Sequence, residues 1–140
     1  MSFGWSVGDL VQGISIGIKV VEALDSTRCA SSRYQEISSF LKNIQNTLEP
    51  LQKDSAAEVY SPSKVEIENL VKAIDEPLCD ILERIQKYDA KLGSQVDPKW
   101  YKHAPQKLLW EFWASPKAKA SRTIIEGHLN TLTLLLQRLT

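Results

Sequence analysis

Cysteine is scarce in this 140-residue chain, which contains only Cys29 and Cys79. Two isolated cysteines cannot build a disulfide scaffold, and they do not have the paired spacing of zinc ligands. Reduced cysteines are the rule in the cytosol. We therefore predict a cytoplasmic protein that has no structural metal site.

An excess of charge of one sign is also lacking, because 17 Lys and Arg residues balance 17 Asp and Glu residues. The chain then has no net positive charge whose electrostatic field would attract nucleic acid or an anionic membrane. The uncharged stretch between Asp9 and Lys19 is far shorter than the roughly 20 apolar residues of a transmembrane helix. The N-terminus has neither the positive leader nor the cleavage site of a signal peptide. We expect a soluble protein in its resting form.

Catalytic signatures are missing from the sequence. It has no Gly-rich phosphate loop and no His-Glu-x-x-His motif. His103 and His128 fall on different predicted elements, and acid pairs such as Glu66 and Glu68 fall on the solvated face of a predicted helix. A catalytic acid needs surroundings that change its pKa, and no such pocket is indicated. We predict that the chain is not an enzyme and binds no cofactor.

The chain is rich in apolar residues spaced three and four positions apart. This spacing is typical of amphipathic helices. Long helices are expected over residues 6–24, from Ser31 or Ser32 to about Pro50, from Pro62 to Gly93, and from Pro116 to the last residue. A short helix is expected over residues 106–113. The four long stripes are Val7, Leu10, Val11, Ile14, Ile18 and Val21; Tyr34, Ile37, Leu41, Ile44, Leu48 and Leu51; Ile67, Leu70, Ile74, Leu78, Ile81, Ile85, Tyr88 and Leu92; and Ile125, Leu129, Leu132, Leu136 and Leu139.

Two prolines refine this prediction. Pro50 should end or kink the second helix, whereas Pro77 interrupts the third without changing the phase of its stripe, which indicates one kinked helix. Helices with one apolar stripe each can cover one another only as a bundle. We predict an all-α fold, a four-to-five-helix bundle with a kinked third helix, formed by residues 1–140 as a single domain. The last helix has no stop signal before Thr140, which favours the N-terminal part of a longer protein.

Two glycines in the first predicted helix, Gly13 and Gly17, form a Gly-x-x-x-Gly pair at the edge of its stripe. Each interior glycine costs about 1 kcal/mol relative to alanine. One interpretation is close packing against a neighbouring helix of the bundle, and the other is helix packing in a membrane after release. Ile16 and Val20 lie outside the main stripe, so this helix is apolar over more than one face.

A segment rich in aromatic and basic residues precedes the last helix. It can plug the bundle with its tryptophans, or it can form an interaction surface at a membrane or with a partner. Binding of nucleic acid would need a denser basic field, and we expect none. The candidate surface residues are Lys99, Trp100, Lys102, Lys107, Trp110 and Trp113.

The opening string Met-Ser-Phe-Gly-Trp-Ser-Val-Gly-Asp-Leu resembles the start of the N-terminal domains of fungal NOD-like (STAND) receptors, which belong to the HeLo-like group of cell-death helical bundles. The segment from Ile67 to Tyr88 is similar to that family's third helix, and the segment from His128 to Leu136 is similar to its last helix. The resemblance implies a fungal source and a signalling or death-inducing role within a larger receptor-like protein.

The resemblance also implies a mechanism, in which the first helix leaves the bundle on oligomerisation and associates with an anionic plasma membrane. Lys19 and Glu22 depart from this pattern, because charges in a bilayer cost several kcal/mol. The rival hypothesis is an interaction module that contacts other proteins or copies of itself and has no membrane activity. The residues assigned to the membrane or switch helix are Val7, Gly8, Leu10, Val11, Gly13, Ile14, Gly17, Ile18 and Val21.

Overall fold

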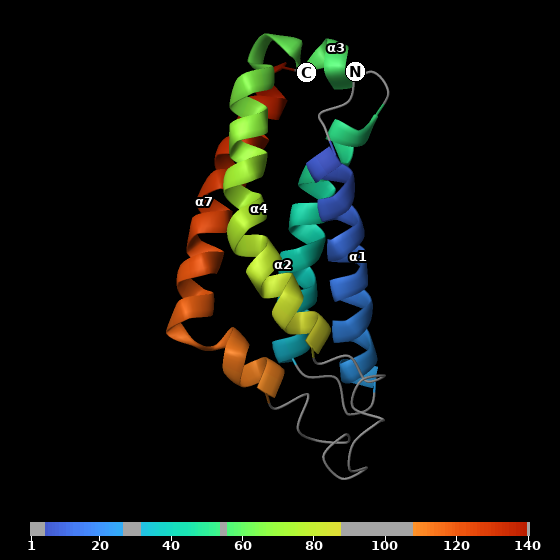
Figure 1. The fold of residues 1–140 in the computed structure, drawn as a ribbon, viewed down its shortest axis with the longest axis vertical. Helices are drawn as coiled ribbons and strands as arrows, with labels where there is room; N and C mark the ends of the chain where they lie inside the picture. Colours follow the sequence, from blue (N-terminus) through green and yellow to red (C-terminus); the bar gives the residue numbers. More distant parts are fainter. Residues whose placement is uncertain (1–4, 27–31, 54–55, 88–107, 140) are drawn as a thin grey trace.

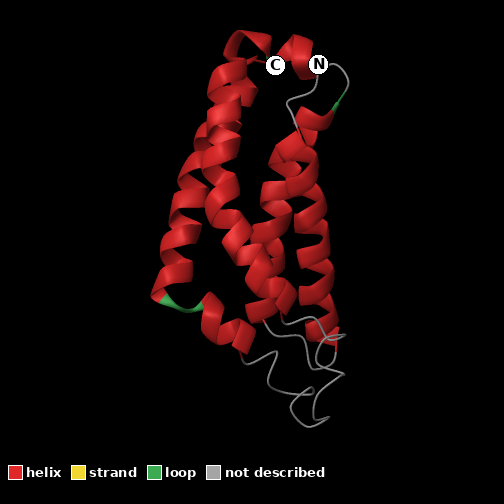
Figure 2. Cartoon of the chain, in the orientation of Figure 1, coloured by secondary structure: helices red, strands yellow, loops and turns green. Residues whose placement is uncertain are grey.

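The computed structural model describes residues 5–26, 32–53, 56–87 and 108–139, and these residues contain helices and no strand (Figure 2). The predicted all-α fold is confirmed. Residues 108–113 form a short helical segment, as expected. The other elements are α1 (Trp5–Ser26), α2 (Ser32–Leu48), the 3-10 helix η1 (Glu49–Gln52), α3 (Ala56–Val59), the 3-10 helix η2 (Ser61–Ser63), α4 (Lys64–Lys87) and α7 (Pro116–Leu139).

The four long helices lie side by side along the length of the molecule (Figure 1). α4 occupies the centre, since it packs against α1 on one side and against α7 on the other. α2 packs mainly against α1. α4 therefore lies between an α1–α2 side and an α7 side of the bundle.

The prolines act as the sequence predicted. α2 ends at Leu48, and Pro50 falls in η1, where the chain tightens into a 3-10 turn that still buries Leu51. Pro77 lies inside α4, which continues through it as one helix. The axis of α4 changes direction along its length (Figure 1), as expected where a proline removes a backbone hydrogen bond.

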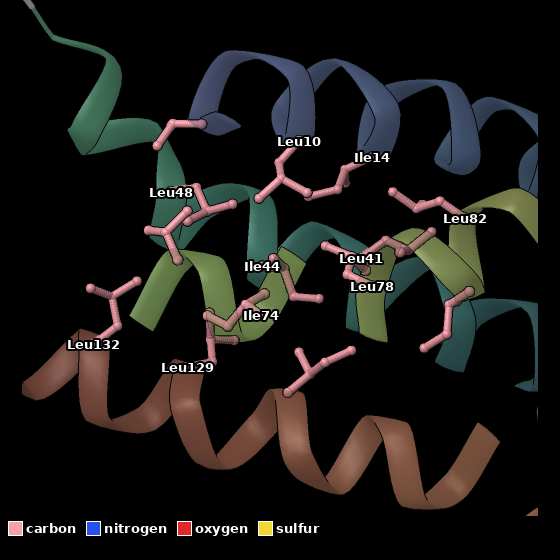
Figure 3. Close-up of a cluster of buried hydrophobic side chains, with 14 of the residues drawn as sticks. Leu10, Ile14, Leu41, Ile44, Leu48, Ile74, Leu78, Leu82, Leu129 and Leu132 are labelled. Carbon is pink, nitrogen blue, oxygen red and sulfur yellow. The ribbon is translucent and has the colours of Figure 1, made fainter. Parts of the chain in front are cut away.

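The predicted stripes supply most of the core (Figure 3). Leu10 and Ile14 of α1, Ile44 of α2, Leu78 of α4 and Leu129 of α7 gather in one buried cluster. The buried arcs are wider than the predicted stripes, because a helix with two neighbours buries more of its surface. The buried hydrophobic residues of the long helices that the stripes left out are Val20, Val71, Leu82, Ala118 and Leu135.

The connection between the second and third predicted helices, where no helix was expected, contains a helical turn. This turn is α3, and the chain then passes through η2 before α4 begins at Lys64, two residues after Pro62. Ala56 and Tyr60 are buried, so this connection covers one end of the bundle. The periodicity could not reveal α3, since a single turn of helix is too short to show a repeat.

Candidate functional site

The first candidate site is the seam that holds α1 in the bundle. Of the residues assigned to a switch helix, Val7, Leu10, Ile14, Ile18 and Val21 are buried. Val11 is partly buried against the core and Gly8 is exposed. Val20, predicted to lie outside the stripe, is buried as well, while Ile16 is 42% exposed. Among the described side chains of α1, Ile16 is therefore the only large apolar one that is exposed.

Gly13 and Gly17 lie on the side of α1 that faces Leu82 of α4. A β-carbon added at Gly17 would lie 3.0 Å from Leu82 Cδ2 and 3.5 Å from Leu41 Cδ1. One added at Gly13 would lie 3.3 Å from Leu82 Cδ1. The two glycines thus form the surface on which Leu82 rests, and close packing within the bundle accounts for them. Sequence reasoning did not identify Leu82 as their partner.

Polar contacts fasten α1 to α2 on the other side of the seam. Gln45 Nε2 donates a hydrogen bond to Ser15 Oγ at 2.7 Å, and this contact is partly buried. Near the end of α1, Lys42 Nζ lies 3.4 Å from Glu22 Oε1, with both side chains about half exposed. Such an exposed pair contributes at most about 1 kcal/mol. These contacts join α1 to α2, and the apolar core contributes more to stability than they do.

The second candidate site was the aromatic and basic segment. Lys99, Trp100, Lys102 and Lys107 lie outside the described residues. Trp110 is partly buried against the core, and Trp113 is only 1% exposed. No partner can reach Trp113 in this conformation, so it is removed from the predicted interaction surface. Trp113 therefore fits the interpretation in which the tryptophans of this segment fill the bundle, and not the one in which they form an interaction surface.

Trp113 joins three elements. Its ring packs edge-to-face on Phe40 of α2, with ring centroids 5.3 Å apart, and its Nε1 donates a hydrogen bond to Glu36 Oε1 at 3.3 Å. The guanidinium of Arg122, from α7, lies 4.0 Å from the Trp113 ring centroid and donates to the Trp113 carbonyl oxygen. Burial lowers the pKa of Arg122, and the negative charges of Glu36 and Glu126 offset part of this effect by raising it.

A third site was not predicted from the sequence: the outer groove between α4 and α7. One hollow of about 570 Å³ lies between the end of α4, the start of α7 and the 108–113 segment, and Arg84 lies over the Phe112 ring there. A second hollow, of about 390 Å³, lies at the other end of the same helix pair, between Glu66 and Leu70 of α4 and Leu134 and Arg138 of α7. The exposed Leu134, outside the core stripe, was the available signal.

Titratable groups give no sign of a reactive centre among the described residues. No three His, Cys, Asp or Glu side chains there are placed to hold a metal ion. Cys79 is exposed, and its Sγ donates a hydrogen bond to Asp75 Oδ1 at 3.1 Å. Partial burial, that hydrogen bond and the charges of Asp75, Glu83 and Asp80 raise the pKa of the thiol to about 11.

We expect Cys79 to be a slow thiol. A pKa raised from 9.0 to about 11 reduces the thiolate fraction at neutral pH about 100-fold, and the greater nucleophilicity of that thiolate recovers roughly a factor of ten. In a Cys29→Ser background, iodoacetamide should alkylate Cys79 about tenfold more slowly than an unperturbed thiol. The rate should reach half its maximum near pH 11, and Asp75→Asn should lower that midpoint. A midpoint at or below pH 9 would contradict this assignment.

No helix among the described residues is both long enough and apolar enough to cross a bilayer. No protein-family model, curated protein or solved structure matched this chain. The resemblance of the opening string to fungal NOD-like receptor domains therefore stays a prediction from the sequence.

Proposed function

We propose that this chain is a signalling domain that acts by contacting other proteins, including copies of itself, while its helical bundle stays intact. The setting that we propose is regulated cell death in a fungus, as part of a receptor-like protein of the NOD-like type. The opening string and the all-α bundle support this setting. The packing of α1 supports the intact bundle, and it is the observation on which the proposal rests.

The free energy that holds α1 in place is large. Six of its side chains are in the core, namely Val7, Leu10, Ile14, Ile18, Val20 and Val21. Burial of each contributes about 1.5–3 kcal/mol, so together they contribute on the order of 10 kcal/mol. The whole folding free energy of a domain of this kind is about 5–15 kcal/mol. Detaching α1 would therefore expose apolar side chains whose gross burial energy, before conformational entropy is subtracted, is as large as the net stability of such a domain.

A second candidate function is membrane association of a released α1. The observation that favours it is Ile16, which is 42% exposed and gives α1 an apolar residue beyond its core face. Moving a population from 1:99 to 99:1 takes about 5.5 kcal/mol of differential binding. Because the burial of α1 favours the closed state more strongly than that, membrane binding would have to supply more than this amount. Lys19 and Glu22, both exposed, add a further cost in a bilayer. We therefore rank this candidate second.

A cross-link between α1 and α2 tests which function holds. Glu22→Cys and Lys42→Cys, in a Cys29→Ser and Cys79→Ser background, place two thiols where the present side chains meet at 3.4 Å. A short bismaleimide would then tie α1 to the bundle at an exposed position. We expect the cross-linked chain, clustered through an inducible dimerisation tag, to self-associate as well as the chain that is not cross-linked. We also expect neither form to release dye from vesicles of phosphatidylcholine and phosphatidylserine.

The control is the same variant labelled with N-ethylmaleimide, which modifies both thiols without joining them. Dye release by this control, abolished by the cross-link, would overturn the intact-bundle proposal and favour membrane association. Loss of self-association on cross-linking would also count against it.

A further inference from the structure

The face formed by α4 and α7 has exposed apolar side chains. Leu134 is 67% exposed and Ile124 is 52% exposed, and both lie on the outer side of α7. Gly127 lies between them on the same side, and a β-carbon added there would meet nothing within 4 Å. Glycine inside a helix costs about 1 kcal/mol, and no neighbour among the described residues explains it here. These features suit a surface that another backbone approaches closely.

The charges of this face are complementary to each other. Glu66 of α4 and Arg138 of α7 line the same hollow, both are exposed, and neither forms an ion pair within the described part of the chain. In the other hollow of this face, α4 contributes Asp80, Glu83, Arg84 and Lys87, and α7 contributes Lys117, so α4 offers acidic side chains and α7 a basic one at both ends. A partner that places an α7 over α4, and an α4 over α7, would match this pattern.

A second copy of the chain is such a partner. α4 and α7 run antiparallel, so Glu66 and Arg138 lie at the same end of the pair (Figure 1). A two-fold axis parallel to the helices, between two such faces, places α4 of each copy over α7 of the other. Glu66 of each copy then faces Arg138 of the other, twice by symmetry. We propose that the α4–α7 face is the self-association surface, a step that rests on the proposed function and deepens it.

The area of the face is large enough for contact with a second copy of the chain. Each helix has 24 residues and is about 36 Å long, and two adjacent helices are about 20 Å wide. The face therefore offers roughly 700 Å² per copy, close to the roughly 800 Å² per partner of a standard interface. Leu134 and Ile124 are its main apolar anchors, so the affinity should be weak and should depend on clustering.

Charge exchange tests the arrangement. Glu66→Arg places two like-charge contacts in each dimer, and Arg138→Glu does the same with the opposite sign. Each variant alone should dimerise about tenfold more weakly than the wild-type chain in sedimentation equilibrium at micromolar to millimolar concentrations. An equimolar mixture of the two variants should form a heterodimer about as stable as the wild-type dimer, because every contact is again between opposite charges.

Each variant also has two like charges within its own groove, and mixing does not change this repulsion. Only the contacts between chains become favourable again in the mixture, so recovery of dimerisation identifies an effect between chains. Leu134→Asp should also weaken dimerisation by at least tenfold, whereas Ile16→Asp, on α1 across the bundle, should leave it unchanged. Self-association that none of the groove variants alters would overturn this surface and leave the proposed function standing. A wild-type chain that stays monomeric at millimolar concentration would overturn the surface as well, and the cross-linking experiment would still decide between the two functions.

Discussion

Replacing Trp113 with alanine should lower the free energy of unfolding by about 3–5 kcal/mol, the range typical of a deleted core tryptophan. The side chain is 1% exposed, packs on Phe40 and donates a hydrogen bond to Glu36. Its loss would leave a cavity between α2 and α7 and would remove the surface on which Arg122 rests. Urea unfolding followed by circular dichroism measures the change.

Trp113→Phe is the matched control, because it keeps an aromatic ring beside Phe40 and loses the hydrogen bond to Glu36. It should cost less than half as much as the alanine variant. A loss below about 1 kcal/mol for Trp113→Ala would show that the residue is not the plug that fastens the 108–113 segment to the bundle.

The second large effect is expected at Gly17. Leucine there would place side-chain atoms where Leu82 Cδ2 and Leu41 Cδ1 now lie, 3.0 and 3.5 Å from the position of a β-carbon. Overpacking of this kind costs about 1–3 kcal/mol or more, which outweighs the roughly 1 kcal/mol that replacing a helical glycine returns. Gly17→Leu should therefore destabilise the bundle, and thermal or urea unfolding measures this.

Gly127→Leu is the control with the opposite sign. It lies in the interior of α7 with open space around it, so the same substitution should raise the free energy of unfolding by up to about 1 kcal/mol in dilute, monomeric protein. Equal effects at the two glycines would contradict the close approach of α1 to α4.

The sequence predicted the helices well because their apolar residues repeat with the helical period over many turns. α4 was recognised as one helix through Pro77 since the phase of its stripe does not change there. Its far end, expected to reach Gly93, lies outside the described residues. Periodicity reports which side of a helix is apolar, and it is strongest in long elements. It fails for a single turn such as α3.

The parts that the sequence could not predict depend on which helices are neighbours. Val20 and Leu82 are buried because α1 and α4 each have two neighbours, which no single stripe reveals. The hydrogen bond from Trp113 to Glu36 joins residues 77 positions apart. The α4–α7 groove likewise exists only once these two helices are side by side. Each of these features arises from tertiary packing rather than from local pattern.

Native-state hydrogen exchange tests most directly whether α1 is an integral part of the bundle. The amides of Ile14 and Ile18 in α1 should open with the same free energy, within about 1 kcal/mol, as those of Ile74 and Leu78 in α4, and that value should equal the global free energy of unfolding. Exchange of the α1 amides at a free energy several kcal/mol lower, while the α4 amides stay protected, would show that α1 leaves a folded bundle and would contradict this account.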